Sequence, residues 1–244
     1  MAEIPSVSYH NIIQASSEAG CPLCRLSEKS VTAYLGALMY ELVNDPEARD
    51  QIRETLGFCN PHAHYLLTLK GSALGTGIIY RDVVNTILKQ LEGARYTQPR
   101  GASLHRLPEA LDPQRPALGS EAAVRALSPR APCPVCVQQE KMEALAVSAL
   151  LAGLEDEKLR AALRGSAGLC LPHLRRALQA VRSQAAFEAL VSLTRDRYAA
   201  LRAELDEFIR KNDYRFQHEG MGAEGDSWKR AVDAMTGRPL IEKS

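Results

Sequence analysis

Cysteine and histidine residues recur in this chain at spacings that suit metal binding. Two segments, CPLC and CPVC, carry a Cys-x-x-Cys pair, and two others, GFCNPH and GLCLPH, carry a Cys-x-x-His pair. Two residues between ligands allow both side chains to reach one ion, and three thiolates with one imidazole are a common tetrahedral zinc set. All six cysteines of the chain belong to these segments. The predicted ligands are Cys21, Cys24, Cys59, His62, Cys133, Cys136, Cys170 and His173.

Zinc, as two ions per chain, is the predicted metal, and other chemistry could use the same ligands. An iron–sulfur cluster accepts the same ligand types. A Cys-x-x-Cys pair at a helix start also suits thiol redox exchange, but no βαβ pattern accompanies it here and exchange needs no third cysteine or histidine. Buried free cysteines without a metal are the remaining alternative. The recurrence of the whole four-residue set argues against that alternative.

The motifs themselves form an internal repeat. CPLC begins at residue 21 and CPVC at residue 133, an offset of 112, whereas GFCNPH at 57 and GLCLPH at 168 are offset by 111. Residues between the motifs also match, such as Lys29 with Lys141 and Arg53 with Arg164. Repeats of this kind indicate that one structural unit is used more than once. We expect each unit to be folded by its own ion, bound by the four ligands of the same half.

The repeat predicts four segments of the chain. These are a first helical metal-binding repeat over 1–96, a proline-rich linker over 97–132, a second helical repeat over 133–211 and a C-terminal tail over 212–244. The linker holds six of the thirteen prolines, as linkers often do.

Each repeat is predicted to consist of helices that position the ligands. Val31, Leu35 and Leu38 recur at helical spacing after the first motif, and the second half has the same pattern. Gly57 and Gly168 are each placed to end a short helix. The proline inside each Cys-x-x-His motif suits the first turn of the helix that follows. A last helix is expected over 78–96 and over 184–211. The glycine-rich segment KGSALGTG, at 70–77, is expected to be the turn before it.

The fold class that follows is all-α, with two pseudo-repeated small helical bundles, each with a Cys₃His metal site, plus a C-terminal tail helix. In that tail helix Trp228, Val232 and Met235 share one face. Asp226 or Ser227 is placed to cap the helix, and we expect the helix to pack onto the bundles.

Composition and charge bound the function. The chain has 244 residues, 45% apolar and 24% charged, with a net charge of +1. Such a balance lacks the basic face that nucleic-acid binding requires, and no apolar run suits a signal peptide or a membrane span. We therefore expect a cytoplasmic protein that binds neither nucleic acid nor membrane. No nucleophile–base set or carboxylate pair is visible, so no enzymatic activity is predicted.

The motifs carry a resemblance to a known family. In CPLC, GFCNPH, CPVC, GLCLPH and the DYRF, EGDSW and RAV elements of the tail, the sequence resembles an uncharacterised bacterial family defined by a domain of unknown function. The resemblance covers nearly the whole chain. It implies one family with a two-site layout and no established activity.

The sequence thus predicts a zinc-binding helical protein with two structural sites, which acts as an interaction or regulatory scaffold for a protein partner. An iron–sulfur electron-transfer protein and a metal or oxidant sensor are the alternative functions. A site filled by four protein ligands holds structure and leaves no open position for catalysis.

Overall fold

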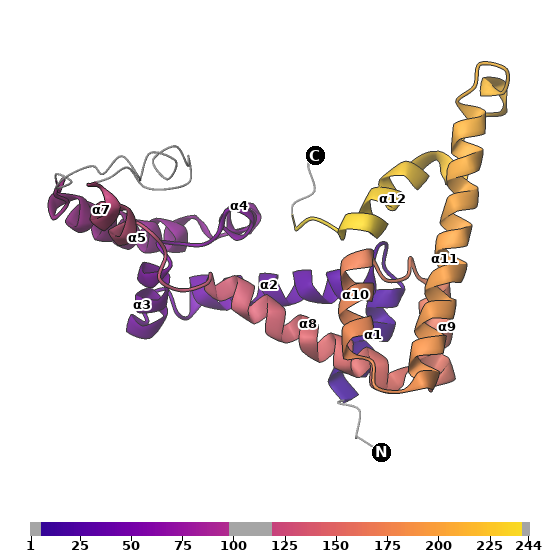
Figure 1. Cartoon of the computed structure of the whole chain (residues 1–244), viewed down its shortest axis with the longest axis horizontal. Helices are drawn as coiled ribbons and strands as arrows, with labels where there is room; N and C mark the ends of the chain where they lie inside the picture. The colour runs from indigo at the N-terminus through magenta and orange to yellow at the C-terminus, as the bar shows by residue number, and fades with distance from the viewer. Residues whose placement is uncertain (1–5, 98–118, 241–244) are drawn as a thin grey trace, which may run out of the picture. The chain divides into compact units, whose positions relative to one another are not determined.

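The computed structural model describes residues 6–97 and 119–240, and within those ranges the chain is all α-helical with no strand (Figure 1). The predicted all-α class, with two Cys/His clusters, is confirmed. The helices are α1 (Ser6–Ser16), α2 (Pro22–Tyr40), α3 (Pro46–Glu54), α4 (Asn60–Thr68), α5 (Ala73–Glu92), α7 (Glu121–Ala126), α8 (Pro134–Gly153), α9 (Glu157–Gly165), α10 (Leu171–Ala180), α11 (Gln184–Lys211) and α12 (Ser227–Thr236), with short 3₁₀ turns η2 (Gln217–Glu219) and η3 (Ala223–Asp226).

The chain forms two compact units, and neither is a continuous half of the sequence. Unit 1 contains residues 1–31 and 138–244, and unit 2 contains residues 32–137. Helix α2 therefore begins in unit 1 and continues in unit 2, whereas α8 begins in unit 2 and continues in unit 1. The predicted segments 1–96, 97–132, 133–211 and 212–244 follow the repeat. The compact units instead divide the chain within these two helices.

The helices of the two halves start at corresponding residues. Helices α2 and α8 start at residues 22 and 134, an offset of 112. The pairs α3 and α9, α4 and α10, and α5 and α11 all start at an offset of 111. The order of helices is therefore the same on both sides of the linker, in step with the motifs. That the two halves arose as copies of one unit stays a prediction.

The core of unit 1 is formed by α1, α8, α9, α10 and α11. Ile12 of α1, Leu150 of α8 and Leu159 of α9 are fully buried in it. Helix α9 begins where the Asp156 side chain accepts hydrogen bonds from the backbone N–H groups of Lys158 and Leu159. The capped helix buries Leu159 and Leu163.

The core of unit 2 is formed around α3, α4 and α5. Helix α3 is capped by Asp45, whose side chain accepts from Ala48 N at 2.8 Å, and it buries Ile52. The chain then turns through Gly57, whose φ of 99° suits glycine. The same role was expected for Gly168, and its φ is 77°.

The expectation that residues 70–77 form a turn is wrong in part. Helix α5 starts at Ala73, so that Gly75 lies inside the helix and is buried. A Cβ atom at Gly75 would lie 2.9 Å from Met39 Sδ. Glycine is therefore needed here for close packing of α5 against α2, and the turn itself is confined to residues before Ala73.

The tail packs onto unit 1, where α12 contacts α10 and α11. Its predicted apolar face is only half buried: Trp228, Val232 and Met235 are 49%, 56% and 44% exposed. Asp226 precedes the helix without capping it and instead accepts a hydrogen bond from Arg230 Nε at 2.7 Å. Polar contacts also attach the tail.

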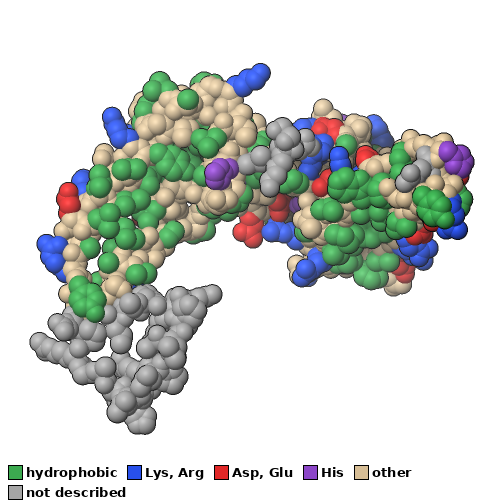
Figure 2. All heavy atoms as spheres, turned by 90° about the horizontal axis from the view of Figure 1, so that it is seen from above, with side chains coloured by type: hydrophobic (Ala, Val, Ile, Leu, Met, Phe, Trp, Pro, Cys, Tyr) green, Lys and Arg blue, Asp and Glu red, His purple; other side chains and the backbone are tan. Residues whose placement is uncertain are grey.

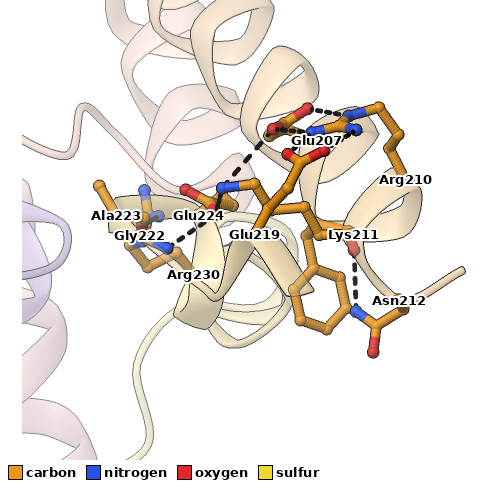
Figure 3. Close-up of polar contacts among 10 residues, drawn as sticks. Glu207, Arg210, Lys211, Asn212, Glu219, Gly222, Ala223, Glu224 and Arg230 are labelled. Carbon is orange, nitrogen blue, oxygen red and sulfur yellow. Dashed lines mark hydrogen bonds and ion pairs between the residues drawn. The ribbon is translucent and has the colours of Figure 1, made fainter. Parts of the chain in front are cut away.

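Figure 3 shows these contacts at the end of α11. Lys211 Nζ donates to Glu224 Oε1 at 2.7 Å, and this contact lowers the pKa of Glu224 to about 2. Arg210 bonds both Glu207 and Glu219. Arg230 donates to the carbonyl oxygen of Ala223 at 2.7 Å. Together these bonds fold the tail back from α11.

The surfaces of both units are mixed. Hydrophobic side chains lie among charged ones on the face that Figure 2 shows. Among the described helices, none is both long enough and apolar enough to cross a lipid bilayer.

Candidate metal centres

Each of the four motifs lies at the start of a helix. Cys59 and Cys170 occupy the N-cap positions of α4 and α10, each with a proline in the first turn. Cys21 and Cys133 directly precede α2 and α8. The second ligand of every motif follows three residues later, so one helical turn brings it beside the first. The partial positive charge of a helix start favours a thiolate there.

The eight predicted ligands come together in two groups of four. Site A consists of Cys21, Cys24, Cys170 and His173, and site B consists of Cys59, His62, Cys133 and Cys136. In each group the ligand atoms lie within 4.8 Å of one another. Site A belongs to unit 1 and site B to unit 2, so each compact unit holds one cluster.

The assignment of ligands to sites by sequence half is wrong. The Cys-x-x-Cys motif of the first half meets the Cys-x-x-His motif of the second half, and the reverse pair forms the other site. Helix α2 separates the two motifs of the first half. Its 19 residues span about 28 Å, with Cys24 at its start, whereas the chain leaves for α3 and α4 from its end. The Cys-x-x-His motif at the start of α4 meets the motif at the start of α8 instead.

The atoms of site A are spaced as the corners of one coordination sphere. His173 Nδ1 lies 3.1 Å from Cys170 Sγ, 3.4 Å from Cys24 Sγ and 3.6 Å from Cys21 Sγ, and the Sγ atoms of Cys24 and Cys170 are 3.6 Å apart. Around a tetrahedral zinc ion, neighbouring ligands are about 3.5 Å apart for S···N and about 3.8 Å apart for S···S. These residues therefore fit a single zinc-sized ion.

Site B has the same geometry. His62 Nδ1 lies 3.1 Å from Cys59 Sγ, 3.4 Å from Cys136 Sγ and 3.9 Å from Cys133 Sγ. The Sγ atoms of Cys59 and Cys136 are 3.5 Å apart, far longer than the S–S bond of a disulfide, which is about 2.05 Å. All six cysteines are free.

In both sites, adjacent thiols oppose one another's ionisation, and a bound cation would relieve this repulsion. In site A, hydrogen bonds with Cys170 and Cys24 lower the pKa of Cys21, whereas hydrogen bonds with Cys170 and Cys21 raise the pKa of Cys24. In site B, burial opposes ionisation of Cys133, but hydrogen bonds from His62 and from the backbone lower its pKa to about 6. Burial and the Cys59 sulfur raise the pKa of Cys136 to about 12. Three adjacent thiols cannot all ionise without a positive ion between them.

A buried carboxylate supports the histidine of site A. Glu143 of α8 is 8% exposed, and its Oε1 lies 3.8 Å from His173 Nε2. It accepts hydrogen bonds from Ser27 Oγ and Gln139 Nε2, both at 3.0 Å, and pairs with Arg176 at 2.9 Å. Burial opposes its ionisation, but His173 and these partners lower its pKa to about 2. A carboxylate behind a metal-binding histidine fixes the orientation of the ring.

Site B has different surroundings. Tyr65 of α4 shares a hydrogen bond of 2.6 Å with Thr32 of α2. In the motif alignment Tyr65 corresponds to Arg176, and Val31 corresponds to Glu143. The charged pair beside site A is thus replaced by neutral residues. Cys24 of site A is partly exposed, as are Cys59 and Cys136 of site B, and the other ligands of both sites are buried.

None of the other described histidines belongs to either cluster. His64 is exposed on α4, and His10 is exposed on α1. His105 lies outside the described residues. Of the two basic residues after Leu174, Arg176 reaches Glu143, and Arg175 is exposed.

Two residues near site A were not predicted from the sequence. Glu143 could have been found, because it lies seven residues after Cys136 and four after Gln139, on one face of the same helix. Tyr198 could not, because nothing in its spacing relates it to the motifs. Its hydroxyl lies 3.2 Å from the carbonyl oxygen of Leu169, next to the ligand Cys170, and 3.3 Å from that of Ala234 in the tail.

The similarity of the chain to known proteins extends over nearly its whole length. A family model described as a family of unknown function (DUF6062) matches residues 4–240. The chain is 24% identical over 228 residues to an uncharacterized 23.9 kDa protein in the xynA 3' region of Caldicellulosiruptor sp. (strain Rt8B.4). The match covers 93% of this chain and 99% of that protein. No solved structure matches the chain.

Proposed function

Because the chain belongs to the family of unknown function DUF6062, whose description gives no activity, we propose a function from the geometry of the two clusters. The protein binds two zinc ions, one in site A and one in site B. The ions hold its helices together, and the folded chain is a cytoplasmic scaffold for a protein partner.

The observation that carries this proposal is the convergence of four helix starts into two sites. Each site takes two ligands from each half of the chain, and the ligand atoms lie within 4.8 Å of one another. A metal ion that joins such distant segments contributes directly to folding free energy. With four protein ligands, neither site has an open position for a water molecule or substrate, so the proposed role is structural and not enzymatic.

Zinc is favoured over an iron–sulfur cluster by the compactness of the sites. A cluster of several iron and sulfur atoms has to fit between its ligands. Sulfur atoms 3.5–3.6 Å apart surround one ion. Thiolate and imidazole together are the ligands typical of structural zinc.

Elemental analysis of the full chain, purified without added metal, tests the proposal. We expect a colourless protein with about two zinc ions per chain. His62→Ala and His173→Ala should each remove one ion and lower the melting temperature. His64→Ala, a change of the same residue type two positions from His62, should keep both ions.

A brown protein with iron and acid-labile sulfide would favour the electron-transfer function instead. A metal-free protein with unchanged helix content would refute metal binding altogether. A partner can then be sought by copurification with the zinc-loaded chain, using the His173→Ala variant as the comparison.

A further inference from the structure

The chain segment that follows α12 lies directly on site A. A Cβ atom at Gly237 would be 3.7 Å from Cys170 Sγ and 3.7 Å from Cys24 Sγ, so the backbone at this residue rests on two of the sulfur ligands. Gly237 has a φ of 81°, a conformation that other residues rarely adopt. The segment thus turns sharply at the point where it meets the sulfur atoms.

A cavity of ≈ 200 Å³ separates the rest of this segment from the site. One side is lined by ligands of site A, including Cys24 and His173, and by Glu143 and Arg176. Residues 237–240 also line the cavity, and we call this segment the strap. The cavity therefore leads to the ligand sulfur of Cys24, and the strap forms one of its walls.

Contacts on both sides of Gly237 hold the strap in place. Tyr198 links the end of α12 to Leu169 through its hydroxyl, which can donate to Ala234 or Leu169. Arg238 lies against Gly20, since a Cβ atom there would be 3.7 Å from Arg238 Cδ. The positive charge of Arg238 also acts on Glu18. These contacts attach the strap to the residues just before Cys21 and Cys170.

We propose that the strap gates the exchange of the metal ion at site A. The ion enters and leaves through the cavity beside Cys24, and a docked strap slows this exchange. This inference rests on the proposed zinc binding. Site B, whose ligands Cys59 and Cys136 are partly exposed and which belongs to unit 2, provides an internal control.

The test compares zinc release from three forms of the full chain after addition of a chromogenic chelator. Gly237→Val places a branched side chain against the two sulfur atoms and cannot keep the native φ without strain. Gly220→Val is the matched control, because Gly220 also has a positive φ of 68° but has no atoms within 4 Å of its Cβ position. A chain that ends at Thr236 removes the strap. Alkylation with N-ethylmaleimide and peptide mapping during release identifies which cysteines have lost their ion.

We expect release from site A to quicken by about tenfold or more in Gly237→Val and in the shortened chain, as when other groups that support a metal site are lost. Cys24 and Cys170 should become alkylated first, with release from site B and from Gly220→Val as in the parent. Unchanged alkylation of Cys24 and Cys170 in both variants would overturn the gate, as would equal acceleration at both sites. A parent protein without zinc would instead refute the proposed function.

Discussion

Glu143 is the residue that most distinguishes the two sites. It supports His173 at Nε2, the nitrogen that faces away from the sulfur atoms, and it is held by Ser27, Gln139 and Arg176. Removal of such a partner typically weakens a metal site by about 10- to 100-fold. We therefore expect Glu143→Ala to lower the zinc affinity of site A by a factor in this range and to leave site B unchanged. Competition with a chelator of known affinity measures both.

Glu140→Ala is the matched control, because Glu140 lies three residues earlier on the same helix and is exposed. It should bind zinc as the parent does. Equal affinities in Glu143→Ala and Glu140→Ala would show that the carboxylate has no part in the site. The sequence contains the information needed to place Glu143 on the face of Gln139, but its partner His173 is 30 residues further along the chain.

At the scale of elements, the tail helix α12 packs on α10 and α11. Its apolar face is only half buried, and Tyr198 of α11 provides a direct hydrogen bond to its last turn. We expect Tyr198→Phe to loosen α12 by about 1 kcal/mol, the usual net contribution of one hydrogen bond. Hydrogen–deuterium exchange should quicken in α12 and not in α9, whose cap and buried leucines are unaffected.

Tyr214→Phe serves as the control, since the Tyr214 side chain is 83% exposed and its loss of a hydroxyl should change nothing. If α12 exchanged equally in the two variants, Tyr198 would not hold the tail. Local patterns predicted that a helix lies here, since α12 covers the residues expected. They did not predict which face packs, because the tail also forms ion pairs with α11. Arg210 and Lys211 of α11 pair with Glu219 and Glu224 of the tail, and Arg230 of the tail pairs with Glu204 of α11.

At the scale of the whole molecule, sequence patterns predicted where the helices lie better than which ligand motifs pair in one site. The signals for helix ends are local. Helices begin near proline and cysteine residues, and they end near Gly57 and Gly168. The pairing of the motifs is not local. Identical motifs in both halves fit either arrangement of ligands, so the motifs alone do not decide between them. A helix was predicted over the residues of α2, but the sequence does not show where α4 lies relative to the start of that helix.

The exchanged pairing makes a prediction about the two halves of the chain. If the chain is divided within residues 98–118, each fragment carries two ligands of site A and two of site B. In the observed arrangement each site needs both fragments, so each fragment alone should bind zinc weakly and have low helix content. When mixed with zinc, the fragments should form a 1:1 complex with two ions, and a chelator should separate them. Circular dichroism and native mass spectrometry measure these properties. A single fragment that folds around one tightly bound zinc ion would show that each half forms its own site after all.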